Sequence, residues 1–272
     1  MRKPRPGRTP EARSSSERLL AVLGLFTLDD SAWTVEDAAA RLRISSPTAY
    51  RYFNRLASVG LISAASRASY VLGPAIVELD RQIRLRDPLL IAGRPTMDHL
   101  IRYSEDGSTI LLCRLYKDRV VCIHQVVGRG PQGPISYERG RPMPLFRGAT
   151  SKIILANLPL RTRAALYRQN RTTIRAAGLG RTWEEFTGSL AQLRRRGVAV
   201  TEAEIDPSRM GIAAPILNPD GRVAGSLTFV LPRIKADRDL VERLASATIA
   251  GAHEIARALT ERQGRVSRRG SR

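Results

Sequence analysis

The sequence predicts an α+β protein with a small helical N-terminal domain and a larger C-terminal domain of mixed helices and strands. Its 272 residues suit about two compact domains, and its 43% hydrophobic content is enough for packed cores. Apolar residues follow a helical period before residue 60 and a mixture of strand and helix periods beyond residue 108. The apolar runs are much shorter than the ~18 residues of a membrane span, and the basic start has no apolar signal segment. We therefore expect a cytoplasmic protein without membrane contact.

Two helices are predicted first. One starts at the capping box Ser14 to Glu17 and carries apolar residues at helical spacing as far as Phe26. The next starts at a second box at Thr34 and ends at about Arg43, where a short turn follows. Such a pair sets up a compact helical domain.

A third helix is predicted with Ser46 as its N-cap, Pro47 as its first residue and Gly60 as its stop. Two helices joined by a tight turn, the second rich in polar and basic residues, describe a helix-turn-helix. Arginine can grip guanine, asparagine can pair with adenine, and threonine can contact a phosphate or a thymine methyl. The candidate DNA-reading residues of this helix are Ser46, Pro47, Thr48, Tyr50, Arg51, Asn54 and Arg55.

A β-hairpin follows this helix directly, with short strands at 61–63 and 68–72. A hairpin in this position is a wing, whose tip lies over phosphates or the minor groove. Arg67 and Ser69 are its candidate DNA contacts. The alternative is a small helical domain whose basic face is merely solvated.

The chain has 45 basic and 25 acidic residues, a net charge of +20, and only four of the basic residues are lysine. Strongly basic chains attract nucleic acid. The charge is spread along the whole sequence, so it does not mark one patch, and an arginine-rich genome would produce the same excess. A nonspecific architectural nucleic-acid binder therefore remains an alternative, and its binding would depend steeply on salt.

The domain boundaries follow from changes in pattern. We expect the DNA-binding domain at 14–72, a connecting helix at 73–86 and the second domain at 87–260, flanked by flexible basic tails at 1–13 and 261–272. In the second domain, strands are predicted at 108–115 and 120–127, a possible third at 141–146, and two more around the turn at Asn218–Gly221. Helices are expected at 87–103, 150–157, 160–169, 182–196 and 238–260. One face of the second strand is predicted to carry Val120, Cys122, His124 and Val126.

Several runs together resemble the winged helix-turn-helix of IclR-type bacterial transcription regulators. The most telling are Thr48-Ala-Tyr-Arg51 in the third helix and Tyr70-Val-Leu-Gly73 after the wing. Others are Glu17–Phe26, Ala38–Leu42 and Leu56–Ile62. The likeness continues through Pro144–Lys152, Arg196–Val200, Gly211–Pro215 and Gly225–Val230, and covers residues 14–256.

This resemblance implies a GAF-like effector-binding domain, an antiparallel sheet flanked by helices, and a ligand-responsive, sequence-specific transcription regulator of small-molecule metabolism. Its partners would be a double-stranded DNA operator, a small-molecule effector and further copies of itself, as a dimer or a dimer of dimers. A two-fold symmetric protein reads a pseudopalindromic operator. No cofactor, metal or catalytic activity is expected.

The resemblance also implies an effector pocket at the loop before residue 150 and along the strands. Thr201 and Thr228 keep hydroxyls, whereas Gly211 and Val230 stand where the family often has polar residues, which favours a less polar ligand. Arg147 would pair with a carboxylate, so we expect a small organic acid, and an aromatic acid would suit the apolar wall. The candidate effector residues are Arg147, Gly148, Ala149, Thr150, Thr201, Gly211, Thr228 and Val230.

Other chemistry is weakly supported. The glycine-rich stretch Gly128–Gly133 follows a strand but precedes no helix that could hold a phosphate, so we expect a surface loop. The three histidines show no metal spacing. Cys113 and Cys122 lie on neighbouring predicted strands, and some GAF-like domains use paired cysteines as reductases. That enzymatic alternative stays open, although buried cytosolic thiols are usually inert.

Overall fold

The computed structural model describes residues 14–65, 68–131 and 135–270, with only the backbone for 263–270. The chain forms two compact units, divided between Leu85 and Arg86. In the described ranges, no helix combines the length and apolarity needed to cross a membrane. Each unit is described here by itself.

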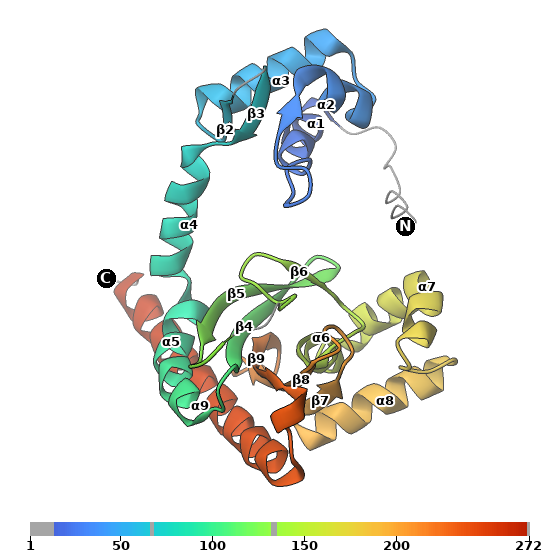
Figure 1. The fold of residues 1–272 in the computed structure, drawn as a ribbon, viewed down its shortest axis with the longest axis vertical. Coiled ribbons are helices and arrows are strands. Elements are labelled where there is room, and N and C mark those ends of the chain that lie inside the picture. The colour runs from blue at the N-terminus through green and yellow to red at the C-terminus, as the bar shows by residue number, and fades with distance from the viewer. Residues whose placement is uncertain (1–13, 66–67, 132–134, 271–272) are drawn as a thin grey trace. The chain divides into compact units, whose positions relative to one another are not determined.

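The first unit has three helices packed on one core (Figure 1). They are α1 (Ser15–Leu23), α2 (Val35–Leu42) and α3 (Ser46–Ser58). α1 begins with the predicted capping box but ends at Leu23, so its predicted extension to Phe26 is wrong. Gly24 follows α1 directly, and glycine is a poor continuation of a helix. The buried core residues are Val22, Val35, Ala38, Ala39, Ala49, Tyr52, Phe53, Leu56 and Ile62.

The predicted hairpin after α3 is confirmed as β2 (Ile62–Ala64) and β3 (Ser69–Leu72). A third strand, β1 (Trp33–Thr34), pairs with β3, which gives an antiparallel sheet of order β1-β3-β2. Two residues are too few to show a strand pattern in a sequence, which is why β1 was not predicted. Strand β1 thus links the hairpin to Thr34, the residue that caps α2.

The predicted connecting helix is present as α4 (Pro74–Arg86). None of its side chains is buried, and Val77, Leu79, Ile83 and Leu85 are exposed by about half or more. α4 thus carries an apolar surface that its own chain leaves uncovered.

The second unit is built on an antiparallel sheet of six strands in the order β6-β5-β4-β9-β8-β7. The pair β8 and β9 forms the predicted hairpin, whose turn includes Gly221 with a φ of 74°. In this order β4 lies beside β9, so neighbouring strands of the sheet are not all neighbours in sequence. The strands are β4 (Thr109–Tyr116), β5 (Arg119–Val127), β6 (Pro142–Pro144), β7 (Ala199–Glu202), β8 (Arg209–Leu217) and β9 (Val223–Pro232).

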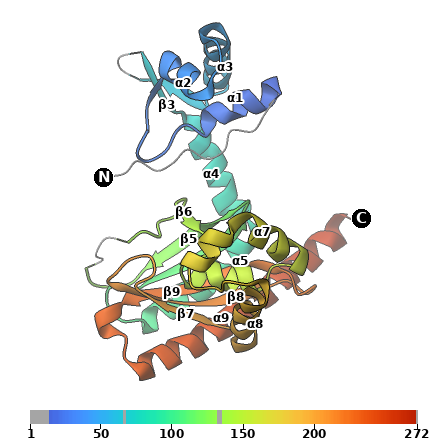
Figure 2. The same cartoon turned by 90° about the vertical axis from the view of Figure 1, so that its right-hand side faces the viewer.

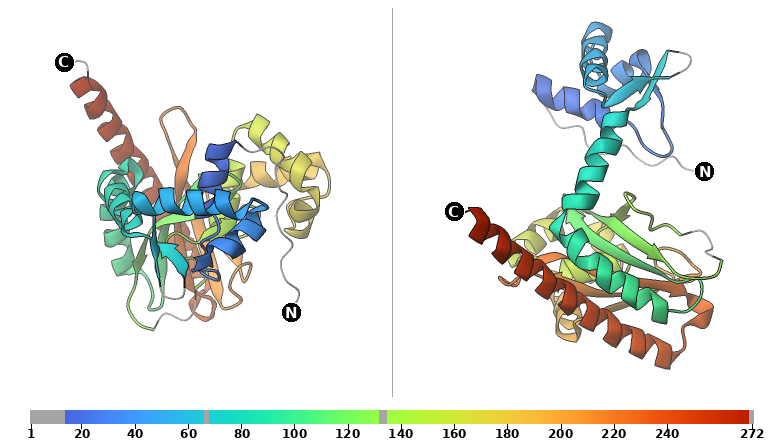
Figure 3. Two further views of the ribbon diagram at one scale, coloured as in Figure 1. Left: turned by 90° about the horizontal axis from the view of Figure 1, so that it is seen from above. Right: turned by 90° about the vertical axis from the view of Figure 1, so that its left-hand side faces the viewer.

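Helices cover both faces of this sheet, so the predicted α+β class and flanked antiparallel sheet are confirmed. α5 (Pro88–Leu100) and α9 (Arg238–Gly270) lie side by side on one face (Figure 3). α6 (Ala149–Ala156), α7 (Leu160–Ala176) and α8 (Trp183–Arg196) belong to the other face (Figure 2). We name the two packed layers the α9 core, which includes Ile110, Leu112, Phe229, Leu244 and Ile255, and the α6 core, which includes Leu111, Cys113, Ile154, Phe186 and Leu190.

The prediction of a single face along the second strand is wrong. Cys122 is opposite Cys113 in the ladder, whereas His124 is opposite Leu112, so Ile123 forms a β-bulge. A bulge adds one residue to one strand and so reverses the faces beyond it. Val120 and Cys122 therefore face the α6 core, whereas His124 and Val126 lie on the side of the α9 core.

Two predicted helix ends are also wrong. α7 runs to Ala176 instead of 169, with a kink at Asn170. The backbone of α9 stays helical to Gly270, through most of the segment 261–272 that was predicted as a flexible tail. Extending an existing helix is far easier than nucleating one, because each added residue gains a backbone hydrogen bond. Composition alone therefore underestimated the length of this helix.

Candidate DNA-binding and effector-binding sites

The solvent side of α3 carries the predicted reading residues. Ser46, Pro47, Tyr50, Arg51, Asn54 and Arg55 are exposed, and Thr48 is half-buried. The opposite side holds Ala49, Tyr52, Phe53 and Leu56 in the core, as the periodicity predicted. Neither Arg51 nor Arg55 forms an ion pair within the described ranges, and the guanidinium of Arg51 lies 5.7 Å from the ring centre of Tyr52. The two guanidinium groups on this face are therefore not neutralised by an ion pair within the described ranges.

The turn before α3 is set by backbone conformation. Arg43 ends α2 in the left-handed conformation, with a φ of 56°. The N-cap of α3 is Ser45, one residue earlier than predicted, and its hydroxyl pairs with that of Thr48 at 2.9 Å. Pro47 is tolerated one position further in because the first four backbone N–H groups of a helix have no partner inside it. Ser46 thus stands within the first turn.

Tyr50 has a partner that the sequence did not predict. Its hydroxyl donates a hydrogen bond to Oε1 of Glu36 on α2, at 2.8 Å. The bond to this carboxylate raises the pKa of Tyr50, because losing the phenolic proton would place two negative charges together. An acidic group therefore stands beside the first turns of α3, although none occurs within its sequence.

Two contacts hold α3 in place. The rings of Phe53 and Tyr70 meet edge to face at 5.0 Å, which joins α3 to strand β3 of the wing. The hydroxyls of Tyr52 and Ser15 lie 3.1 Å apart and join α3 to α1. Ser69 is half-buried on β3 opposite Thr34, and Arg67 lies outside the described residues.

The predicted effector residues come together where α6 begins above strands β7, β8 and β9. The backbone N–H of Ala149 donates to Oγ1 of Thr201 at 3.0 Å. Thr201 is opposite Gly211 in the ladder, and Gly211 is opposite Val230. Residues more than fifty positions apart thus form one small region on the α6 side of the sheet.

Two buried hydroxyls in this region satisfy each other. Thr150 on α6 and Thr228 on β9 are 3% and 1% exposed, and their Oγ1 atoms lie 3.0 Å apart. A buried hydroxyl without a partner is costly, so this pair is a stable arrangement. It is also a polar point that a ligand can compete for.

A carboxylate from the chain itself lies at the N-terminus of α6. Oε2 of Glu204 accepts a hydrogen bond from the N–H of Gly148 at 2.9 Å, and Nζ of Lys152 lies 2.5 Å from Oε1. Arg147 donates to the backbone carbonyl of Glu204. The amino end of a helix attracts anions because its N–H groups are unpaired and its dipole is positive there. The amino end of α6 and Lys152 thus hold a carboxylate of the chain itself.

Gly148 permits this approach. Its φ of 80° is a conformation that residues with side chains rarely adopt. A Cβ atom at this position would lie 3.1 Å from Cγ1 of Ile205, which belongs to the loop after β7. Glycine at position 148 therefore lets the loop after β7 close on the start of α6 without backbone strain.

Glu204 and Lys152 were missed at the sequence level. Lys152 lies one helical turn after Gly148, and it is one of four lysines in an arginine-rich chain, which was the one available signal. Glu204 had none, because its position depends on how the loop folds back. The predicted Arg147 contributes to this contact through the Glu204 backbone.

Cys113 and Cys122 lie opposite each other on β4 and β5, as predicted, and both thiols are free and buried. Burial and the hydrogen bond with Cys122 raise the pKa of the Cys113 thiol well above its usual range. Little thiolate is available at neutral pH, and the thiolate is the reactive form.

The glycine-rich stretch that begins at Gly128 is followed by no helix within the described residues up to β6.

Comparison with known proteins agrees with this architecture. The model of the IclR helix-turn-helix domain matches residues 15–65, and that of the C-terminal region of IclR bacterial transcriptional regulators matches 85–257. The transcriptional regulator KipR of Bacillus subtilis is 22% identical over 239 residues, covering 88% of this chain and 94% of KipR. XynR of Escherichia coli is 26% identical over 218 residues, covering 79% and 84%.

Solved structures share the fold over 90% of the chain. An IclR regulator from Alicyclobacillus acidocaldarius has a TM-score of 0.75 at 22% identity, with 98% of its own chain covered. An IclR homologue from Microbacterium hydrocarbonoxydans, complexed with 4-hydroxybenzoate, has a TM-score of 0.72 at 23% identity, with its whole chain covered. The two family models together account for the reading helix and for the unit that holds the α6 site. The chain therefore belongs to the IclR family of bacterial transcriptional regulators, with a helix-turn-helix DNA-binding domain and an effector-binding C-terminal domain.

Proposed function

We propose that this regulator binds a pseudopalindromic operator through α3 and changes its operator affinity when a small organic acid binds at the start of α6. The observation that carries the proposal is the carboxylate of Glu204, held by the N–H of Gly148 and by Lys152. An effector carboxylate would take its place. The operator would lie near genes for the metabolism of that acid, and the protein would act in the cytoplasm, where those genes are.

In the proposed complex, α3 enters the major groove. Arg51 and Arg55 grip guanines or phosphates, and Asn54 pairs with adenine. Tyr50 offers its ring, since Glu36 already holds its hydroxyl. The wing residues Arg67 and Ser69 contact the phosphate backbone of the DNA. The remaining proposed contacts are Ser46, Pro47 and Thr48.

The proposed effector lies against an apolar wall with few hydroxyls. Thr201, Thr228 and Thr150 orient it, and Gly148 and Arg147 hold its acid group. Gly211 and Val230, with Ala149, leave an apolar surface that suits an aromatic ring. The 4-hydroxybenzoate complex of the Microbacterium homologue makes that compound the natural first ligand to test.

We further propose a homodimer, or a dimer of dimers, because α4 exposes Val77, Leu79, Ile83 and Leu85 without covering them. Uncovered apolar surface of this kind marks interaction sites. In this proposal residues 14–72 read DNA, 87–260 bind the effector, and the helix at 73–86 couples them. Such coupling is typically worth about 1–3 kcal/mol.

Two other functions are less well supported. A nonspecific architectural binder does not explain the α6 site. A thiol reductase would need an exposed, acidic thiol, whereas burial raises the pKa of Cys113. We therefore propose that the chain is not an enzyme and needs no cofactor.

The test is selection of duplexes from a random DNA pool, followed by fluorescence anisotropy at fixed salt with the selected and a scrambled duplex. We expect a pseudopalindrome to be enriched, and 4-hydroxybenzoate to change its affinity by roughly 5- to 150-fold. Equal affinity for both duplexes with a steep salt dependence would favour the architectural binder. If sugars or amines act and organic acids do not, the proposed effector class is wrong.

A further inference from the structure

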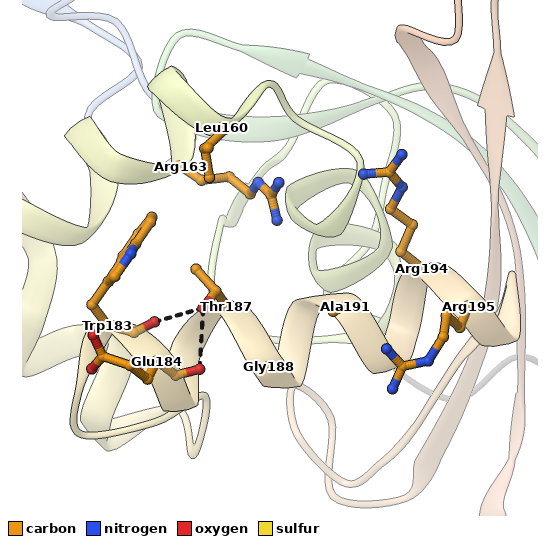
Figure 4. Close-up of a pocket in the computed structure, with 9 residues that line it drawn as sticks. All are labelled: Leu160, Arg163, Trp183, Glu184, Thr187, Gly188, Ala191, Arg194 and Arg195. Carbon is orange, nitrogen blue, oxygen red and sulfur yellow. Dashed lines mark hydrogen bonds between the residues drawn. The ribbon is translucent and has the colours of Figure 1, made fainter.

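An open cavity lies in the effector-binding unit, between α7 and α8 (Figure 4). Its volume is about 800 Å³, within the range of small-molecule sites. None of its lining residues belongs to the α6 site described above. They are Leu160, Arg163, Trp183, Glu184, Thr187, Gly188, Ala191, Arg194 and Arg195.

Two arginines converge on this cavity. Arg163 comes from α7 and Arg194 from α8, and Figure 4 shows both guanidinium groups directed into the space between the helices. Neither forms an ion pair within the described ranges, and Nε of Arg163 is buried without a hydrogen-bond partner there. Glu184 lies at the other end of the cavity, beyond Trp183.

Without a ligand, the placement of Arg163 beside Arg194 is electrostatically unfavourable. Burial, and then the positive charge of Arg194, lower the pKa of Arg163 from its usual value. A buried donor without a partner loses its hydration and gains nothing in return. A bound anion would supply the missing acceptor and offset the repulsion between the two cations.

Gly188 keeps the cavity open. It lies in the middle of α8, where glycine is unfavourable because it loses the most conformational freedom. A Cβ atom at this position would meet nothing within 4 Å, so close packing does not require glycine. The missing side chain leaves volume in the floor of the cavity.

An aromatic ring lies at the end opposite the arginines. The ring of Trp183 is fixed edge-on to Tyr167 at 5.4 Å and is 5.9 Å from Phe186. Leu160, beside Arg163, and Ala191 add apolar surface to the cavity. A fixed indole beside apolar side chains suits a flat ring.

We infer that the cavity between α7 and α8 binds a second small organic anion, an aromatic carboxylate whose acid group pairs with Arg163 and Arg194 and whose ring lies against Trp183. This site is separate from the α6 site and does not depend on the function proposed for it. It gives the regulator a second point at which an acid can act.

The test uses the full-length protein with ¹⁵N-labelled tryptophan and benzoate as the probe. The chain has two tryptophans, Trp33 and Trp183, so two indole signals report separately on the two units. We expect benzoate to shift the Trp183 signal in a saturable way and to leave Trp33 unchanged. Because α6 packs against α8, the Arg163 and Arg194 variants are what separate binding in this cavity from binding at α6. Absence of a Trp183 shift up to millimolar benzoate would overturn the inference.

Variants make the test specific. Arg163→Gln and Arg194→Gln should each weaken benzoate binding at least about tenfold, since each removes a charge-assisted bond. Gly188→Leu should abolish the shift by filling the floor without changing charge. Arg196→Gln is the matched control, because Arg196 is exposed at the end of α8 and does not line the cavity, and it should change affinity by less than about twofold. Equal losses in Arg196→Gln and Arg194→Gln would reduce the effect to overall charge and contradict the site.

Two further probes test the ligand class. Inorganic phosphate, which has charge but no ring, and benzyl alcohol, which has a ring but no charge, should each bind much more weakly than benzoate. If phosphate shifts the Trp183 signal at the same concentrations as benzoate, the cavity does not recognise a ring. Thermal unfolding of each variant serves as the check that the unit carrying the cavity is folded, because Trp33 reports only on the other unit.

Discussion

The DNA-reading face and the α6 site both attract anions, but one is open and the other is filled. On α3 the guanidiniums of Arg51 and Arg55 face solvent without acidic partners. At α6 the N–H of Gly148 and the ammonium of Lys152 already hold the carboxylate of Glu204. Under the proposed function the difference follows from the ligands. DNA brings a dense array of phosphates and needs a surface, whereas a small acid would need a partly buried site, where a cation without a partner is costly.

The reading face should depend most strongly on the core beneath it. Phe53 is fully buried and joins α3 to the wing, so Phe53→Ala should lower the stability of the first unit by about 3–5 kcal/mol. Urea titration followed through Trp33 measures this, and operator binding should be lost with it. Leu20→Ala on α1 is the control, because Leu20 is 60% exposed. If Phe53→Ala left the urea midpoint unchanged, the Phe53 ring would not support the reading face.

The second largest effect tests whether the open face reads bases. Arg51→Ala should cost about 1–3 kcal/mol of operator affinity and relax specificity at one base pair. Competition anisotropy with operator and random DNA measures it. Arg18→Ala, an exposed arginine on α1, should change both affinities little. Equal losses on both DNAs for Arg51→Ala would assign Arg51 to the backbone instead.

The third effect tests whether the α6 site is closed by its own hydrogen bonds. Thr150→Val leaves the buried hydroxyl of Thr228 without its partner and should cost about 1–3 kcal/mol of stability. The double variant Thr150→Val with Thr228→Val removes both hydroxyls and should recover most of that loss. Thermal unfolding of these two variants and of the single variant Thr228→Val completes the cycle. Additive losses would mean that the two hydroxyls do not satisfy each other.

The smallest effect tests whether Glu204 competes with the effector. Glu204→Gln replaces a charge-assisted bond with a neutral one, a difference of about 1 kcal/mol. Acid binding should therefore strengthen by roughly five- to tenfold in isothermal titration with 4-hydroxybenzoate. Glu202→Gln is the matched control, since Glu202 is exposed and pairs with Arg233. Weaker binding in Glu204→Gln would make Glu204 a ligand contact and not a competitor.

Much of this architecture could be predicted from local patterns. Apolar spacing placed the core face of α3, and the capping residues Ser14, Thr34 and Thr182 mark helix starts in both the sequence and the structure. The turn at Gly221 placed the β8–β9 hairpin. The family resemblance supplied the candidate effector residues, and the register of β7, β8 and β9 brings Thr201, Gly211 and Val230 together.

The sequence by itself determined the helices, the hairpins and which face of α3 is polar, because these depend on interactions within about four residues. Tertiary structure alone decided that Glu204 would occupy the helix end at Gly148, 56 positions away, and that Glu36 would hold Tyr50. It also decided the bulge at Ile123, which divides β5 between two cores. Such contacts depend on sheet register and loop closure, and no short-range pattern encodes them.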